Sequence, residues 1–306
     1  MSQGRVLLTG ATGFIGSHIA EALLQAGHEV LALHRTSSDR WRLAGVAGPL
    51  TWINSDDANW EQVVVSLRPE FLVHSAWLGV SASQRDDWES QLTNLSFTLQ
   101  LLKLVAQGPI RRVVALGSQA EYGLFHGRVD EASETSPTSA YGAVKLATLE
   151  VLKAFCQGAG MEWCWLRVFS VFGPREDKHW FVSFVVDNLL ANQPTNLTAC
   201  EQQYDYMFVR DLARAVTQVV GAEPGTSGVY NVSSNTATSL KTIVSAIQEL
   251  TSSRSVINYG AVPYRPGQVM HMEGNSNRFR QVFGEIQSTP LPEALAEVIN
   301  FVRLNK

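Results

Sequence analysis

A glycine-rich turn near the N-terminus is the sequence feature that most constrains how this chain can fold. Gly10, Gly13 and Gly16 recur every third residue in segment 9–16 (TGATGFIG), between an apolar run and a stretch with helical periodicity. Glycines at a strand–turn–helix junction allow a tight turn, close approach of the backbone to a pyrophosphate, and close packing of helix on strand. A glycine trio alone is a weak signal, but its place in a βαβ unit favours a dinucleotide site. The predicted contact residues are Gly10, Thr12, Gly13, Phe14, Ile15 and Gly16.

Short β-rich runs alternate with longer helical patterns through the first half of the chain. The predicted strands are Arg5–Thr9, Glu29–His34, Leu50–Asn54, Glu70–Ser75, Arg112–Gly117 and Glu162–Val168. Several are continuous apolar runs, as in a parallel sheet that is covered on both faces. Periodic helices are predicted from Phe14 and over Trp88–Gln107 and Ala140–Gln157. This alternation predicts an α/β fold built on a doubly wound parallel sheet.

The regular alternation loosens after Gly173-Pro174. Helices are predicted over Lys178–Ala191, Ser239–Leu250 and Leu291–Leu304, strands over Thr195–Cys200, Tyr204–Phe208 and Val229–Val232, and Asp211 as the N-cap of a helix Leu212–Val220. We expect a dinucleotide-binding domain of residues 1–172, to which residues 201–232 return. The remaining segments, 173–200 and 233–306, are expected to form a smaller substrate-binding lobe.

Composition excludes several other classes of protein. Hydrophobic residues make up 45% of the 306 residues and charged residues 17%, so the chain can bury a large core and is not disordered. The net charge of −4 gives no electrostatic reason to expect nucleic acid or an anionic membrane as a partner. No secretory signal or membrane-spanning run is visible, which predicts a soluble, cytoplasmic protein. The three scattered cysteines form no disulfide framework, and neither they nor the histidines are spaced as ligands of a metal.

The end of the second strand bears on which dinucleotide binds. An NAD site places an acidic residue there for the ribose 2′-hydroxyl, whereas a 2′-phosphate requires a cation. Arg35 stands at this place, with Ser38 and Arg40 nearby as further phosphate donors. We therefore favour NADP(H), with NAD(H) as the other possibility. After the third strand, Asp56 or Asp57 is a candidate acceptor for the adenine amino group, although either can equally be an ordinary loop acid.

A second constellation bears on chemistry. Tyr141 and Lys145 are four residues apart at the head of an apolar helix, so their side chains share one face. A neighbouring ammonium favours the phenolate and lowers the pKa of a tyrosine, which can then exchange a proton with a carbonyl oxygen while hydride moves at the carbon. Ser118 ends the fifth strand, at the edge where ligands bind in open α/β sheets, and can bond the same oxygen.

With these motifs in place, the chain resembles the extended short-chain dehydrogenase/reductase family over essentially its whole length. The matching segments are Thr9–Gly16, His74–Ala76, Asn94, Gly117–Gly123, Tyr141–Lys145, Phe172–Pro174, Asp205–Asp211 and Tyr230–Val232. The resemblance implies a Rossmann fold, a nicotinamide cofactor that Ala76 helps to bind, and usually a nucleoside-diphosphate sugar as substrate. It implies that Ser118, Tyr141 and Lys145 are catalytic, that Lys145 also bonds the nicotinamide ribose, and that Asn94 supports the site. It also implies a homodimer, paired through the helices 88–107 and 140–157.

Departures from the family pattern narrow the expected reaction. In sugar 4,6-dehydratases an Asp and a Glu follow the catalytic Ser/Thr, whereas this chain has Gln119 and Ala120, so dehydration is not expected. The 4-epimerases commonly keep an acidic residue where Arg35 stands. The segment Gly117–Gly123, together with Ala76 and Trp77, resembles the 4-ketoreductases that make deoxysugars such as abequose or 6-deoxytalose. This resemblance predicts an NADP(H)-dependent reductase of a nucleoside-diphosphate 4-keto-6-deoxysugar. The alternatives are a nucleoside-diphosphate-sugar 4-epimerase with tightly bound NAD, and a non-catalytic dinucleotide sensor or scaffold.

The resemblance also suggests residues that contact the substrate. Arg265 matches the arginine that clamps the diphosphate, although as part of a Pro-Gly turn it can equally be a surface residue, and Arg175 is a candidate helper. Ser170 and Tyr204 stand where the family often has Asn and Arg. The further candidates around the sugar are Trp77, Asn94, Ser118 and Gln119.

Overall fold

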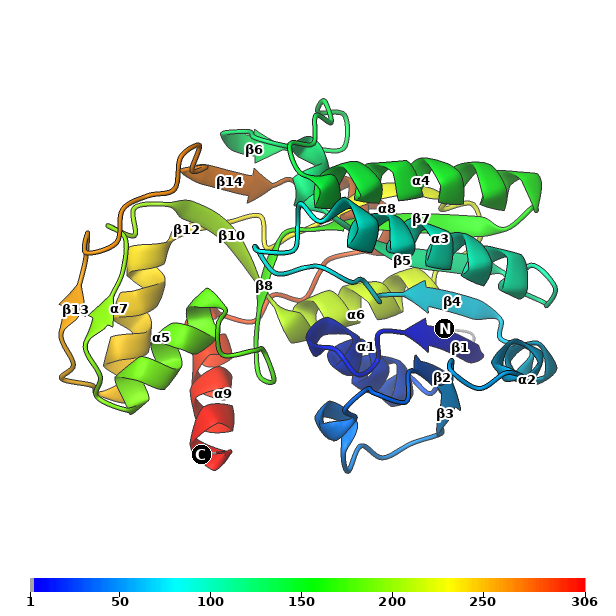
Figure 1. Ribbon diagram of the computed structural model, residues 1–306, viewed down its shortest axis with the longest axis horizontal. Coiled ribbons are helices and arrows are strands. Elements are labelled where there is room, and N and C mark those ends of the chain that lie inside the picture. Colours follow the sequence, from blue (N-terminus) through cyan, green and yellow to red (C-terminus); the bar gives the residue numbers. More distant parts are fainter. Residues whose placement is uncertain (1–2, 306) are drawn as a thin grey trace.

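The computed structural model describes residues 3–305 and confirms the predicted doubly wound α/β fold. Within these residues seven strands form one parallel sheet, which lies in the right half of Figure 1. In spatial order they are β11 (Gly228–Val232), β7 (Glu162–Val168), β5 (Arg112–Ser118), β4 (Phe71–His74), β1 (Arg5–Thr9), β2 (Glu29–His34) and β3 (Leu50–Asn54). The strand order reverses between β1 and β4, and ligands of such sheets bind beyond the carboxyl ends of the strands at that point.

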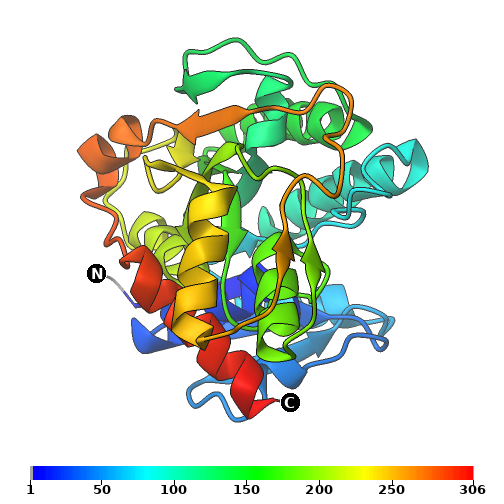
Figure 2. The same ribbon diagram turned by 90° about the vertical axis from the view of Figure 1, so that its left-hand side faces the viewer.

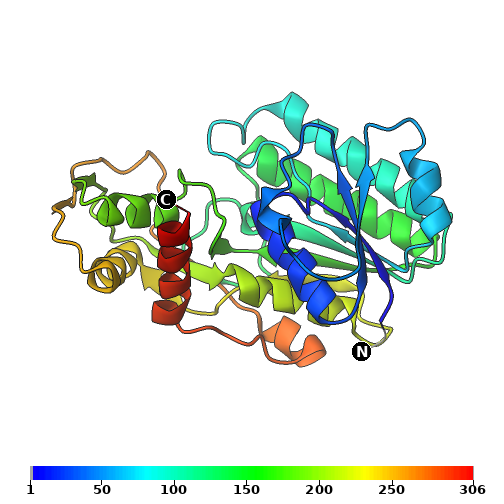
Figure 3. The same ribbon diagram turned by 90° about the horizontal axis from the view of Figure 1, so that it is seen from below.

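Helices cover both faces of this sheet, as its apolar strands require. One face packs against α1 (Phe14–Gln25) and α6 (Val209–Val220), with Ile19, Leu23 and Val216 fully buried between the layers. The other packs against α2 (Trp60–Leu67), α3 (Trp88–Val105) and α4 (Ala140–Gly158), with Leu101 and Leu152 among the buried residues. Figure 3 shows these helices around the sheet, with a second lobe beside them.

The second lobe is built around a smaller, mixed sheet. Its strands are β12 (Ala237–Ser239), β10 (Gln203–Phe208), β14 (His271–Gly274) and β6 (Gly127–Val129), with β8 (Ser170–Phe172) pairing with β10. The helices α5 (Phe181–Leu190), α7 (Leu240–Thr251) and α9 (Leu291–Leu304) enclose a separate apolar core. A two-stranded pair, β9 (Thr195–Asn196) and β13 (Ile257–Asn258), lies at its edge, and α8 (Asn277–Phe283) packs against β11. Figure 2 shows α7 and α9 in front of this lobe.

Two local predictions are wrong. Asp211 is not an N-cap, because α6 begins at Val209; Asp211 lies in its first turn and accepts hydrogen bonds from the Thr289 backbone at 2.8 Å and its hydroxyl at 2.7 Å. The predicted strand over residues 195–200 stops at Asn196, and the chain takes a left-handed turn at Cys200 (φ 57°). Both differences arise from contacts or backbone geometry that residue periodicity does not carry.

The structure also describes the cysteines and the hydropathy of the helices. All three cysteines are free and buried. None of the helices within residues 3–305 has the length and hydropathy needed to cross a membrane.

Candidate active site

The glycine turn has the geometry of a cradle for an anion. Gly10 has φ 76°, and a Cβ there would lie 2.7 Å from the Ala76 backbone nitrogen; a Cβ on Gly16 would lie 2.0 Å from the Gly10 oxygen. The turn is closed by a hydrogen bond from Gly13 N to Gly10 O at 2.9 Å. Gly13 is also the N-cap of α1, and no side chain caps that end of the helix. The residues present therefore fit a pyrophosphate. The N–H groups at the start of α1 are free, the positive end of the helix dipole lies there, and the glycines place no side chain in the way of an anion.

The segment after β4 lies directly against this turn. Ala76 N donates to Thr9 Oγ1 at 3.2 Å, and Thr9 Oγ1 bonds the ring of His74 at 2.8 Å. These contacts join the ends of β1 and β4 at the point where the strand order reverses. Ala76 thus lies beside the predicted dinucleotide contacts.

At the end of β2 the structure brings Arg35 and Asp56 to one place. Asp56 Oδ2 accepts from Thr36 N at 2.8 Å, and these bonds with the nearby charge of Arg35 hold the pKa of that carboxyl below its usual range. Asp57 instead accepts from Asn54 Nδ2 at 3.2 Å. Arg35 is exposed, and its backbone N–H donates to Ser38 Oγ at 3.1 Å. A cation and an acid therefore share the site that distinguishes a ribose 2′-hydroxyl from a 2′-phosphate.

The three predicted catalytic residues meet at the carboxyl edge of the main sheet. Ser118 is the last residue of β5, and Tyr141 lies in the first turn of α4, which is capped by the Ser139 side chain. Tyr141 is 8% exposed, and its phenol lies beside Ser118, whose side chain opposes the rise in pKa that burial causes. Lys145 lies one turn further along α4 and donates from Nζ to Leu116 O at 2.6 Å.

The charges at this site differ from the sequence prediction, which attributed a lowered pKa of Tyr141 to Lys145. Burial raises the pKa of Tyr141 above its usual value, and Ser118 and Arg85 are the groups that oppose it. The Arg85 guanidinium lies 5.0 Å from the centroid of the Tyr141 ring. Burial also lowers the pKa of Lys145 to about 7. Two cationic side chains, Arg85 and Lys145, therefore lie beside the Tyr141 ring, and Arg85 is the nearer.

Trp77 forms a wall of the same site. Its ring centroid lies 3.5 Å from Lys145 Nζ, and it meets the Tyr141 ring edge-on at 6.1 Å. Trp77 Nε1 donates to Gln91 Oε1 at 2.8 Å, and the fully buried Gln91 in turn bonds the Gly79 carbonyl at 2.9 Å. The indole is thus held over the catalytic pair.

Asn94 and Gln119 are placed differently. The Asn94 side chain accepts from Leu78 N at 2.7 Å and donates to Leu78 O at 3.1 Å, so it fixes the segment that follows Trp77. Gln119 is half-buried in a short 3-10 helix, Gln119–Tyr122, next to Ser118.

The candidate substrate residues of the second lobe do not form one cluster. Tyr204 Oη donates to Val269 O at 2.6 Å. Burial raises the pKa of this tyrosine, and the charge of Arg265, which therefore lies nearby, is among the groups that oppose the rise. Ser170 lies in β8 and pairs with Tyr206 of β10. Arg175 is engaged elsewhere, because its guanidinium binds both Glu21 oxygens at 2.7 and 2.8 Å and joins α1 to the second lobe.

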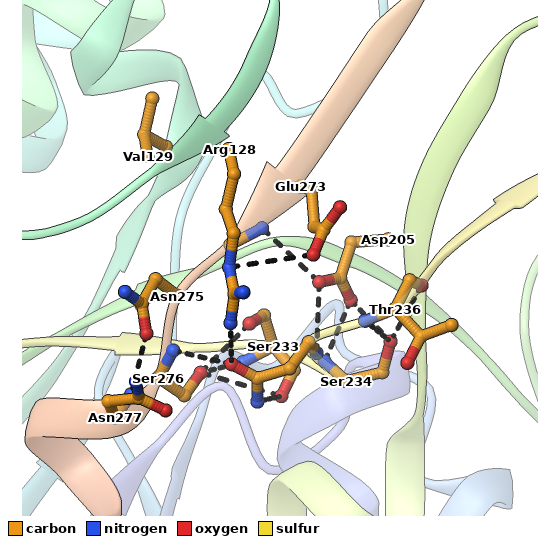
Figure 4. A network of polar contacts seen from close by, with 12 residues as sticks. Arg128, Val129, Asp205, Ser233, Ser234, Thr236, Glu273, Asn275, Ser276 and Asn277 are labelled. Atoms are coloured by element: carbon orange, nitrogen blue, oxygen red, sulfur yellow. Dashed lines mark hydrogen bonds and ion pairs between the residues drawn. The ribbon is translucent and has the colours of Figure 1, made fainter.

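A network of polar contacts around Asp205, the residue after Tyr204 in β10, connects the strands of this lobe (Figure 4). The fully buried Asp205 accepts from Ser234 N and Ser234 Oγ at 2.7 Å each, from Asn235 N at 3.1 Å and from Gly274 N at 3.2 Å. It thereby ties β10 to the segment after β11 and to the end of β14. Arg128 adds an ion pair to Glu273 at 3.5 Å, which attaches β6.

Sequence reasoning missed two groups at the site. No sequence pattern pointed to Arg85, because it lies in a loop that only the fold brings to Tyr141. The Arg85 backbone oxygen accepts a hydrogen bond from Tyr141 N at 2.8 Å. For Glu121 the sequence offered a place near the pocket but favoured a structural role. The spacing of Ser118 and Glu121 is that of a capping box, which the structure contains, and this spacing was a readable signal.

A doubly wound sheet with an open glycine turn at its switch point, and a serine, a tyrosine and a lysine at the same edge, defines a Rossmann-fold enzyme that uses a dinucleotide. The chain belongs to the NAD dependent epimerase/dehydratase family, whose pattern matches residues 6–233.

The chain is also similar in sequence and structure to individual proteins that are known. A UDP-glucose 4-epimerase from Mycolicibacterium smegmatis is 27% identical over 98% of both chains. A CDP-abequose synthase from Salmonella muenchen is 24% identical over 89% of both. The structure of MoeE5 in complex with UDP-glucose and NAD superimposes with a TM-score of 0.86 at 29% identity, over 99% of both chains.

Proposed function

We propose that this protein catalyses a redox reaction at C4 of a nucleoside-diphosphate sugar, with a nicotinamide dinucleotide bound at the glycine turn. One observation carries the proposal: Ser118, Tyr141 and Lys145 meet at the sheet edge that the glycine turn also occupies. Relatives named for sugar nucleotides, which align over most of the chain, support the substrate class.

The residues have distinct roles in this reaction. The residues of the glycine turn would hold the dinucleotide, which would supply the hydride chemistry at C4. Tyr141 Oη takes the proton of the C4 hydroxyl during oxidation and gives it back during reduction. Ser118 donates a hydrogen bond to the same oxygen, and Lys145 donates to the nicotinamide ribose. Trp77 shields the reacting atoms from water.

The comparisons favour the epimerase form of this chemistry, which reverses the order predicted from sequence. A 4-epimerase oxidises C4 and returns the hydride to the opposite face, so the dinucleotide must stay bound through the cycle. The M. smegmatis relative bears the name of such an enzyme, and the MoeE5 structure contains NAD.

The reductase form is the second candidate, and Arg35 is the observation that favours it. Arg35 is exposed at the end of β2, with Ser38 and Arg40 nearby, as a 2′-phosphate requires. Asp56 beside it is the group that opposes this choice. The relative named CDP-abequose synthase supports the same reading.

The dinucleotide carried by the purified protein separates the two forms. Epimerase function predicts stoichiometric NAD that survives gel filtration, and conversion of UDP-glucose into UDP-galactose without added cofactor. Reductase function predicts protein free of dinucleotide, and oxidation of NADPH on addition of a nucleoside-diphosphate 4-keto-6-deoxysugar. If a panel of UDP-, dTDP-, CDP- and GDP-linked sugars gives neither result, the proposal is wrong.

We also propose that the protein is a homodimer that pairs through α3 and α4. Trp88 and Leu92, one turn apart on α3, are 56% and 49% exposed, which leaves an apolar face on that helix. Light scattering should give twice the mass of one chain, and the mass of a single chain would contradict the proposal.

A further inference from the structure

A buried ion pair lies beneath the catalytic end of β5. Glu121 is fully buried. Its carboxylate accepts from Ser118 N at 2.8 Å, from Trp165 Nε1 at 2.9 Å and from Arg167 Nε at 2.7 Å. The carboxylate therefore has three donors, one of which is the backbone of a catalytic residue.

The local sequence is shaped around this carboxylate. Ser118 and Glu121 form a capping box at the N-terminal end of the short 3-10 helix, in which the Ser118 side chain accepts from Ala120 N at 3.2 Å. At position 117 a Cβ would lie 2.1 Å from Trp165 Nε1 and 2.6 Å from Glu121 Oε1. Glycine at 117 thus leaves room for the carboxylate under the strand.

A buried ion pair is not needed to fill this space. Replacing such a pair with apolar side chains of similar volume is often neutral or stabilising, because desolvation offsets the attraction between the charges. The presence of a carboxylate here, next to the catalytic group, therefore calls for a reason other than packing.

The surroundings of Lys145 supply that reason. Its ammonium is packed against the Trp77 ring, with the Tyr141 and Trp165 rings 5.9 Å away. His74 lies close by on β4 but is neutral, because burial lowers its pKa to about 3. Glu121 is the group whose charge raises the pKa of Lys145, against the lowering that burial causes.

We propose that Glu121 is a positioning residue for the catalytic group: its buried carboxylate holds the backbone of Ser118 and, bonded to the Trp165 indole whose ring lies 5.9 Å from Lys145 Nζ, places a negative charge near that ammonium. Lys145 then remains a cation able to donate to the ribose of the dinucleotide. This inference rests on the proposed roles of Ser118 and Lys145.

Arg167 provides the contrast. It pairs with Glu121 at 2.7 Å and stacks on the Tyr122 ring at 4.6 Å, on the side of the carboxylate that does not bond Ser118. Changes that keep both charges but disturb this pair should therefore affect stability without affecting Lys145.

The test measures NADH binding, which requires no sugar, by titrating nucleotide fluorescence from pH 6 to pH 9. The affinity of the wild-type protein should fall as pH rises through the pKa of Lys145, since the neutral amine is a weaker donor. In Glu121→Gln, which keeps the shape and removes the charge, the midpoint of this fall should move to lower pH by about one unit, equivalent to roughly tenfold weaker binding above it. Glu121→Asp and Arg167→Lys keep the charge, and their midpoints should match the wild type even if their melting temperatures are lower.

Three results would overturn the inference. One is a midpoint for Glu121→Gln equal to that of the wild type. Another is an equal shift in Glu121→Asp or Arg167→Lys, which would indicate a purely structural role. A third is wild-type protein that, after removal of any resident dinucleotide, binds neither NADH nor NADPH, which would also end the proposed function, whereas the first two would not. If Glu121→Gln does not fold, the double variant Glu121→Gln/Arg167→Gln, which leaves no unpaired charge, must still move the midpoint to lower pH, by less than the single variant because the positive charge of Arg167 is removed as well.

Discussion

The two halves of the site are built in different ways. On the dinucleotide side, the glycine turn is shaped by backbone contacts: those of Gly13 and Gly16 with Gly10 span three and six residues, and the Ala76 backbone approaches Gly10 from the neighbouring strand. On the substrate side, Tyr204 is held by Val269, 65 residues away, and Asp205 collects donors from two other segments. The first half is thus constrained by steric rules, and the second by side chains brought together from distant parts of the chain.

The largest loss of activity is expected from a change at Tyr141, where the two halves of the site meet. Tyr141→Phe removes the hydroxyl that moves the proton and keeps the ring packed on Trp77. We expect kcat to fall about 10³-fold, within the range for loss of a general acid–base, with dinucleotide affinity unchanged. Tyr230→Phe, far from the site, is the control. Unaltered turnover or unaltered behaviour in the cell would favour the non-catalytic sensor.

The next effect compares two glycines of the same turn. Gly16→Ala places a Cβ 2.0 Å from the Gly10 oxygen, whereas Gly13→Ala places one at 3.3 Å. Overpacking at Gly16 should cost about 2 to 3 kcal/mol, which corresponds to a melting temperature lower by at least ~5 °C. Gly13→Ala should melt near the wild-type temperature. Equal melting temperatures for the two variants would show that the helix does not pack on the turn as described.

A smaller effect is expected on the substrate side. Arg265→Ala removes an exposed cation near Tyr204. If Arg265 binds the diphosphate, KM for the nucleotide sugar should rise about tenfold with little change in kcat. Arg254→Ala, another exposed arginine of this lobe, is the control. An equal rise of KM in both variants would show that Arg265 acts only through the overall positive charge of the lobe and does not bind the diphosphate.

The smallest effect concerns cofactor choice. Arg35→Ala should weaken NADPH binding by about fivefold and leave NADH binding unchanged, if Arg35 pairs with a 2′-phosphate in solvent. Arg68→Ala, an exposed arginine at the C-terminus of α2, is the control. If neither affinity changes, the cofactor is NAD and Asp56 is the residue to examine.

The same contrast explains how much of the molecule was predictable. The parallel sheet, its helices and the group Ser118, Tyr141 and Lys145 follow from local spacing and from strand ends, which a sequence displays. The pairing of β6 with β14 does not, because the partners are more than a hundred residues apart and short strands carry no register signal.

Charges were the least predictable part of the site. From the sequence, Lys145 was predicted to lower the pKa of the Tyr141 phenol, because the two residues share a helix face. In the fold, burial changes both groups, and Arg85 and Glu121 approach them from other elements. Such pKa values depend on tertiary distances and on desolvation, and neither is visible in spacing.

The central claim is that Tyr141 exchanges the proton of the reacting sugar oxygen. It is tested most directly by a crystal structure of the protein with NAD and a nucleotide sugar. The account predicts the Tyr141 hydroxyl within about 3 Å of the sugar O4, with the nicotinamide C4 facing the sugar C4. A structure in which that hydroxyl is far from both atoms, or in which Trp77 fills the space between them, would contradict it.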